Sequence, residues 1–178
     1  MHDLPFDRNG FLRDSDGGYV KGGTSFEFSR LLIAELAVGW AERTYVDPRL
    51  SRLQGLLTTG SLVWNATPLT LVKFFSDTQI NETTLPGSAG VLVHTYSFEV
   101  DHDFRRWLTG VGKFIYGTYE YQDDIRRDKT YSIEGDLIYK MNRNLWIKGT
   151  IRHDILDSNV PLSSSQATVV MVGVRLQN

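Results

Sequence analysis

Apolar and polar side chains alternate along most of the chain, so that every second residue of long segments is apolar. Residues 130–141 show this most clearly, with Tyr131, Ile133 and Leu137 in the apolar set and Glu134 and Asp136 between them. A repeat of two residues indicates an extended strand, because successive side chains of a strand point to opposite faces of the sheet. The sequence therefore predicts strands with one apolar and one polar face.

The alternation predicts nine strands, over residues 17–29, 31–43, 55–66, 69–79, 89–100, 105–121, 129–141, 145–156 and 167–177. The usual strand of a soluble protein has about 5–6 residues, and a tilted strand that crosses a membrane needs about 9–11. The predicted strands are long enough to cross. They indicate an all-β fold, an antiparallel up-and-down transmembrane β-barrel of the outer-membrane type.

The connections between these strands differ in length at the two ends. Short ones, rich in the turn formers Asn, Asp, Ser and Pro, fall at 29–31, 65–68, 101–104 and 142–144, and longer polar ones at 44–54, 80–88, 122–128 and 157–166. Outer-membrane barrels have short periplasmic turns and longer extracellular loops. We therefore expect residues 1–16 to be a loop or an N-terminal extension and residues 17–178 to form the barrel strands.

The charged residues of the strands share the polar face and have nearly balanced signs. Isolated charges are too costly in a dry core, so this face is expected to line a wet lumen. The predicted lumen-lining residues are Lys21, Glu27, Glu35, Arg43, Lys73, Asp77, Glu99, Lys113, Glu134, Asp136, Lys140, Lys148, Arg152, Asp154 and Arg175.

Aromatic residues gather near the short connections. Trp64, Phe98, Phe104, Trp107, Tyr139 and Trp146 are predicted to form the girdle that outer-membrane barrels place at a membrane interface. The alternative is a set of cross-strand aromatic pairs.

Strand parity raises the question of whether this sheet closes alone. With short turns in the periplasm, the first of nine strands begins on the extracellular side, whereas an even-stranded barrel has both termini in the periplasm. We expect the chain to be the C-terminal part of a larger barrel; the alternative is that eight strands close without residues 17–29. Residues 1–16 show no basic n-region followed by an apolar h-region, the pattern of a secretory signal, and Met1–Pro5 resembles the interior of a loop.

Composition excludes several other classes of protein. A net charge of −2 gives no basic surface for nucleic acid, and the absence of cysteine excludes disulfides and thiolate metal sites. The longest apolar stretch, residues 31–40, is interrupted by Glu35 and is about half of what a spanning helix needs.

No set of residues indicates catalysis, a metal or a cofactor. His94, His102 and His153 are not spaced as chelating pairs, and no serine, histidine and acid are gathered as a triad. We therefore expect no enzymatic activity. We expect Asp123, Asp124 and Asp128, with Arg126 and Arg127, to form a solvated loop; the alternative is that they bind a cation or bridge lipopolysaccharide.

Five segments carry a family resemblance: 36–50 (LAVGWAERTYVDPRL), 60–70 (GSLVWNATPLT), 81–90 (NETTLPGSAG), 100–108 (VDHDFRRWL) and 141–146 (MNRNLW). They resemble the outer-membrane β-barrel porins of Gram-negative bacteria, a family also described as β-barrel porin-2, some of whose members sit among exopolysaccharide export genes. The resemblance covers about residues 17–178 and looks like the C-terminal half of a member.

The resemblance implies a location in the bacterial outer membrane and passage of polar solutes, with a link to polysaccharide export. Its implied partners are the lipid bilayer, lipopolysaccharide and the barrel insertion machinery, and it supplies no active site. The chain ends Leu176-Gln177-Asn178, where barrels of this kind place an aromatic residue for insertion. Two alternative interpretations of the sequence are a small non-conducting barrel that acts as an anchor or adhesin, and a soluble ligand-binding barrel.

Overall fold

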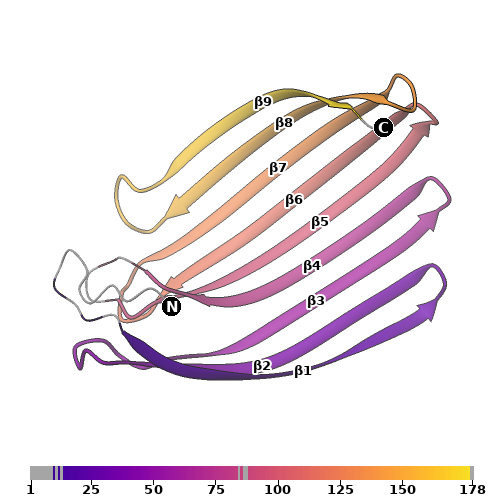
Figure 1. The fold of residues 1–178 in the computed structure, drawn as a ribbon. Coiled ribbons are helices and arrows are strands. Elements are labelled where there is room, and N and C mark those ends of the chain that lie inside the picture. Colours follow the sequence, from indigo (N-terminus) through magenta and orange to yellow (C-terminus); the bar gives the residue numbers. More distant parts are fainter. Residues whose placement is uncertain (1–9, 11, 13, 84, 86–87, 177–178) are drawn as a thin grey trace.

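The fold was taken from a computed structural model, which describes residues 10, 12, 14–83, 85 and 88–176. In this part of the chain the strands form one sheet in sequence order, each antiparallel to the next (Figure 1). They are β1 (Ser15–Ser29), β2 (Leu32–Tyr45), β3 (Leu53–Thr67), β4 (Thr70–Asn81), β5 (Val91–Arg105), β6 (Leu108–Tyr121), β7 (Arg127–Lys140), β8 (Leu145–Ser158) and β9 (Ser165–Leu176). The all-β, up-and-down prediction is confirmed.

One predicted connection is wrong. Residues 101–104 do not form a turn, because β5 continues to Arg105 and the chain reverses at Arg106 and Trp107. Asp101 and Asp103 suggested a turn by their residue type, but both lie on the polar face. There the Asp101 carboxylate binds the Lys73 ammonium at 2.8 Å, which lets an acidic residue continue the strand.

The two faces of the sheet differ in chemistry and in exposure. We call the face that carries Lys73 and Glu99 the inner face and the opposite one the outer face. The inner-face Ser132 is 8% exposed, whereas its neighbour on the outer face, Ile133, is 60% exposed. The sheet is curved (Figure 1), and side chains crowd on the inside of a curve, so the polar inner face is the concave one. This inverts the arrangement of a soluble protein, which buries its apolar residues.

The sheet is not closed. Among the described residues no ladder joins β1 to β9, and each of them pairs on one side alone. Since neighbours alternate in direction along an odd number of strands, β1 and β9 run the same way and cannot pair with each other antiparallel. The described residues contain no helix that is long and apolar enough to cross a membrane.

The small dry core lies at the long-loop end of β2 to β5. Tyr45, Leu50, Leu53 and Ala89 are buried together and Ile80 packs against them. Here the β3–β4 ladder stops at the Thr59–Asp77 pair, and loops 46–52 and 82–90 supply Leu50 and Ala89. The hydrophobic cluster therefore anchors two loops at one mouth of the curved sheet.

Candidate functional site

The strand register places all the predicted lumen-lining residues on the inner face. Paired residues of neighbouring strands share a face, and successive residues of one strand alternate. Following the pairs from β1 to β9 connects the whole predicted set, from Lys21 on β1 to Arg175 on β9. Their shared face is thus a property of the fold, while their position in a lumen stays a prediction because the sheet is open.

A row of charges with alternating sign crosses the middle of the inner face. Lys73, Glu99, Lys113, Glu134 and Arg152 are successive register partners on β4 to β8. The Lys73 ammonium lies 2.7 Å from the Glu99 carboxylate, and the Lys113 ammonium lies 3.6 Å from the same carboxylate. We call these five residues the charge row. Opposite charges across strands attract, so the row stabilises its own register.

Further ion pairs flank the charge row. The Lys148 ammonium lies 2.8 Å from the Asp136 carboxylate, and Arg152 Nε donates to Asp154 at 2.8 Å. Asp136 also accepts a hydrogen bond from the Thr150 hydroxyl. Most of these side chains are half-exposed and therefore remain in contact with water. The inner face is a wet surface with compensated charge.

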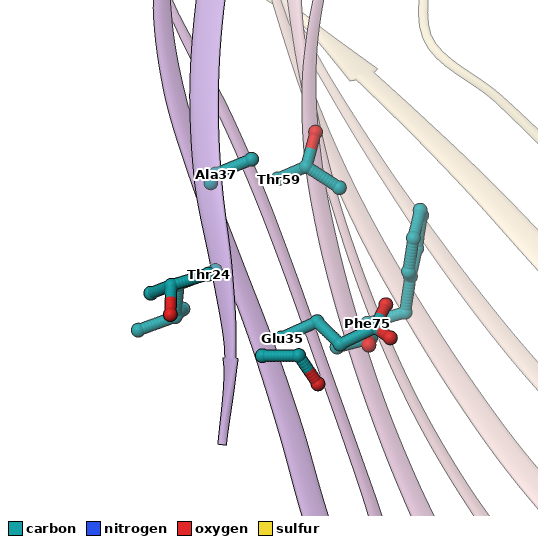
Figure 2. Close-up of a pocket in the computed structure, with 9 residues that line it drawn as sticks. Thr24, Glu35, Ala37, Thr59 and Phe75 are labelled. Carbon is teal, nitrogen blue, oxygen red and sulfur yellow. The ribbon is translucent and has the colours of Figure 1, made fainter.

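A hollow of about 360 Å³ lies on the sheet between β1 and β4 (Figure 2). Its lining includes Glu35, Thr59, Ser61 and the exposed ring of Phe75. Beside it, the Lys21 ammonium reaches the Thr59 hydroxyl on β3. Lys21 faces Gly39 on the intervening strand, where no side chain stands in its way. The hollow therefore combines an aromatic surface, hydroxyl groups and a carboxylate.

The outer face carries an aromatic row that the sequence analysis missed. Tyr96, Tyr116 and Tyr131 are register partners, with ring centroids 6.2 Å apart in the first pair and 5.1 Å apart in the second. Eight residues nearer the short turns on β7, Tyr139 packs edge-on against Trp107 at 5.4 Å. Eight residues of a strand span about 26 Å. The apolar outer face thus lies between two aromatic rows, as in membrane barrels.

Two residues of the predicted girdle are misplaced. Phe98 lies in the middle of β5, because the strand runs on to Arg105, and it pairs with Phe74 and Phe114 on the outer face. Trp146 lies on the inner face, where the Lys140 ammonium and the Arg175 guanidinium pack over its ring at 5.4 and 5.6 Å. Trp64, Phe104, Trp107 and Tyr139 do lie near the short turns.

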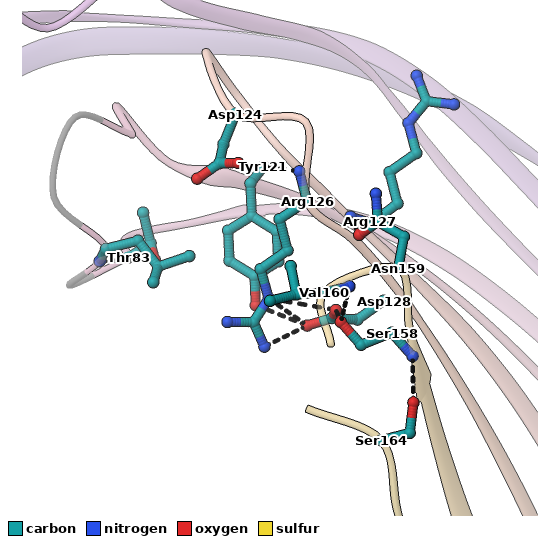
Figure 3. A network of polar contacts seen from close by, with 11 residues as sticks. Thr83, Tyr121, Asp124, Arg126, Arg127, Asp128, Ser158, Asn159, Val160 and Ser164 are labelled. Carbon is teal, nitrogen blue, oxygen red and sulfur yellow. Dashed lines mark hydrogen bonds and ion pairs between the residues drawn. The ribbon is translucent and has the colours of Figure 1, made fainter. Parts of the chain in front are cut away.

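Polar contacts join the β6–β7 loop to the β8–β9 loop (Figure 3). The buried carboxylate of Asp128 accepts hydrogen bonds from Arg126 Nε at 2.9 Å and from the Ser158 hydroxyl at 2.6 Å. Asn159 donates to the Ile125 carbonyl at 2.6 Å. Asp128 is therefore engaged within the protein. Nowhere in the described residues do three or more acidic or histidine side chains gather as a metal site.

Asp47 holds the β2–β3 loop to the N-terminal segment. Asp47 is 3% exposed, and its carboxylate accepts hydrogen bonds from the Arg49 side chain at 2.6 and 2.9 Å and from the N–H groups of Arg49 and Leu12. The Arg49 side-chain hydrogen bonds, then the two backbone N–H groups, hold the pKa of Asp47 well below its usual range, although burial acts in the opposite direction.

A lowered pKa makes this loop sensitive to acid. The ordinary pKa of an aspartate, 3.8, applies to the unfolded chain, and the pKa of Asp47 in the folded protein is lower. The ionised carboxylate therefore stabilises the fold above pH 3.8, and this stabilisation is lost as the pH falls through the pKa of the folded state. We expect faster amide hydrogen exchange at Leu12 and Arg49 in D47N than in the parent at pH 6, and a smaller difference at pH 2 after correction for intrinsic exchange. Asp124, in the exposed β6–β7 loop, provides the matched control D124N. An exchange ratio that is independent of pH would contradict the assignment.

An antiparallel sheet with a charged concave face and an apolar outer face bounded by aromatic rows defines a β-barrel protein of the membrane class. The chain belongs to the family described as putative beta-barrel porin 2, whose model matches residues 1–178. This porin-like family indicates a membrane location. No curated protein matches the chain, and no solved structure does.

Proposed function

We propose that this sheet is part of the wall of an outer-membrane channel for polar solutes. The observation that carries the proposal is the charge row, which lies on the concave face of a sheet whose outer face is apolar. Water in a lumen solvates such a row, whereas a dry interior would not tolerate its half-exposed members. The short turns are assigned to the periplasm and the longer loops to the outside.

We further propose that the sheet belongs to a larger barrel. The described strands are odd in number and leave β1 and β9 unpaired, so an all-antiparallel closure takes an odd number of further strands. Barrels of eight strands have an interior just wide enough for side chains, and those of about 16–18 strands enclose an aqueous channel. The larger barrel leaves the charge row in contact with the solute.

The solutes are proposed to include saccharides, which would link the protein to polysaccharide export. Support comes from the hollow, where the exposed Phe75 ring stands near the hydroxyls of Thr59 and Ser61. A sugar presents an apolar ring face and hydroxyl groups, and this lining matches both. The proposal includes lipopolysaccharide and the insertion machinery as partners, and neither nucleic acid nor a catalytic role.

A non-conducting anchor is the second candidate. The ion pairs of the inner face, such as Lys148–Asp136 and Lys73–Asp101, favour it if the barrel is narrow, because paired side chains then fill the interior.

Conductance in planar bilayers separates the two candidates. We expect the closed barrel that contains this sheet to conduct, with little preference between cations and anions because the inner charges are balanced. E99Q/K113Q, which removes one charge of each sign, should leave the selectivity unchanged. A barrel that inserts yet stays silent at all voltages would support the anchor and overturn the channel.

A further inference from the structure

The short-turn end of the sheet is basic. Arg30 lies in the β1–β2 turn, Arg105 and Arg106 at the β5–β6 turn, and Arg143 in the β7–β8 turn. The turn residues 30–31, 68–69, 106–107 and 141–144 include no aspartate or glutamate. All these turns lie at the same end of the sheet (Figure 1). We call the four arginines the arginine rim.

The arginines of the rim lack the ion pairs that most arginines at the other end make. At the long-loop end, the guanidinium of Arg43 binds Glu82 at 2.8 Å, that of Arg49 binds Asp47 at 2.6 Å and that of Arg126 binds Asp128 at 2.8 Å. The four rim arginines are exposed, and within the described residues none makes an ion pair. The rim thus presents uncompensated positive charge to its surroundings.

Exposed apolar side chains accompany the rim. Leu31 follows Arg30, Trp107 follows Arg106, and Met141 precedes Arg143 by two residues; all three are exposed. Phe104, also exposed, stands on the outer face beside Arg105. Apolar and aromatic groups next to cations are typical of the zone where hydrocarbon meets lipid headgroups.

We propose that the arginine rim binds the phosphate groups of anionic phospholipids in the leaflet on the short-turn side. The guanidinium group offers parallel N–H donors that match phosphate oxygens, and it holds its charge at any physiological pH. A negatively charged leaflet complements the uncompensated rim, while Leu31 and Trp107 enter its hydrocarbon edge. The inference rests on the proposed membrane function.

The test uses lipid selectivity of the closed barrel that contains this sheet, reconstituted in phosphatidylcholine vesicles. Spin-labelled phosphatidylglycerol or phosphatidylcholine is added in trace amounts, and electron paramagnetic resonance measures the fraction immobilised by the protein. We expect this barrel to prefer phosphatidylglycerol and the variant R30Q/R105Q/R106Q/R143Q to lose about fivefold or more of that preference. Sodium chloride should weaken the preference of the parent, because salt screens exposed charges.

Two further variants make the result specific. R105K/R106K keeps the charge and should retain most of the preference, whereas R105Q/R106Q should lose a large part of it. The matched control is R127Q/K129Q, which removes two exposed outer-face charges at the long-loop end. There Glu120 stands opposite Arg127 and Asp157 opposite Lys129, so little preference should be lost.

Unchanged lipid preference in the quadruple variant, or an equal loss in R127Q/K129Q, would overturn the proposal. A closed barrel that immobilises neither lipid has not entered the membrane. That outcome would contradict the proposed function itself, and the two failures are thereby distinguishable.

Discussion

Arginine in place of Ile151 is expected to lower the free energy of unfolding from a bilayer by about 2–4 kcal/mol. Ile151 is 58% exposed on the outer face and pairs with Gly135 and Val170. Gly135 lies midway between Tyr131 and Tyr139, which belong to the two aromatic rows. The new guanidinium would therefore stand near the middle of the hydrocarbon, where a charge costs most. The measurement is a urea titration of the closed barrel that contains this sheet, folded into phosphatidylcholine vesicles.

The matched control places the same side chain on the inner face. In V111R the arginine would lie between Asp101 and Asp136, the register partners of Val111 on β5 and β7. Water and two carboxylates compensate its charge there, so we expect a much smaller loss than in I151R. Equal losses at the two positions would show that the outer face does not meet lipid.

The second large effect is expected from reversing the acidic members of the charge row. In E99K/E134K the row would carry five positive charges on neighbouring strands, with Lys73, Lys113 and Arg152 retained. One sign would then dominate the field along the wall, and the permeability ratio of chloride to potassium should rise about threefold or more. The reversal potential under a salt gradient measures this ratio. K73E/K113E should shift it towards potassium.

A swap within the charge row provides the control. E99K/K113E exchanges the two signs and leaves the net charge of the inner face unchanged, so its selectivity should stay near that of the parent. If E99K/E134K inserts and conducts with the selectivity of the parent, the charge row does not line the conducting path.

The sequence alone predicted the strands and their faces because alternation is a local property. In β7, the exposed Ile133 and the inner-face Glu134 are neighbours in sequence, and pleating alone sends them to opposite faces. The same rule correctly grouped the predicted lumen-lining residues, from Lys21 to Arg175. It needs no knowledge of which strand lies beside which.

Turn positions were less predictable, since turn formers also suit a wet strand. Asp101 and Asp103 have the side chains of a turn, but ion pairs with Lys73 on β4 and Lys140 on β7 hold them in β5. Because the strand was predicted to end at residue 100, Phe98 was assigned to the membrane interface. It lies instead in the middle of β5. The N-terminal part of the expected extension 1–16, at residues 1–9, 11 and 13, and the position of Asn178 lie outside the described residues.

What the sequence determined by itself is the strand composition, the two chemically distinct faces and the family. The tertiary structure alone decided which charges meet, because cross-strand pairs depend on register between residues distant in sequence. Lys73 and Glu99 are separated by a loop, yet they lie 2.7 Å apart. Register also brought Tyr96, Tyr116 and Tyr131 into one row and placed Trp146 between Lys140 and Arg175 on the inner face.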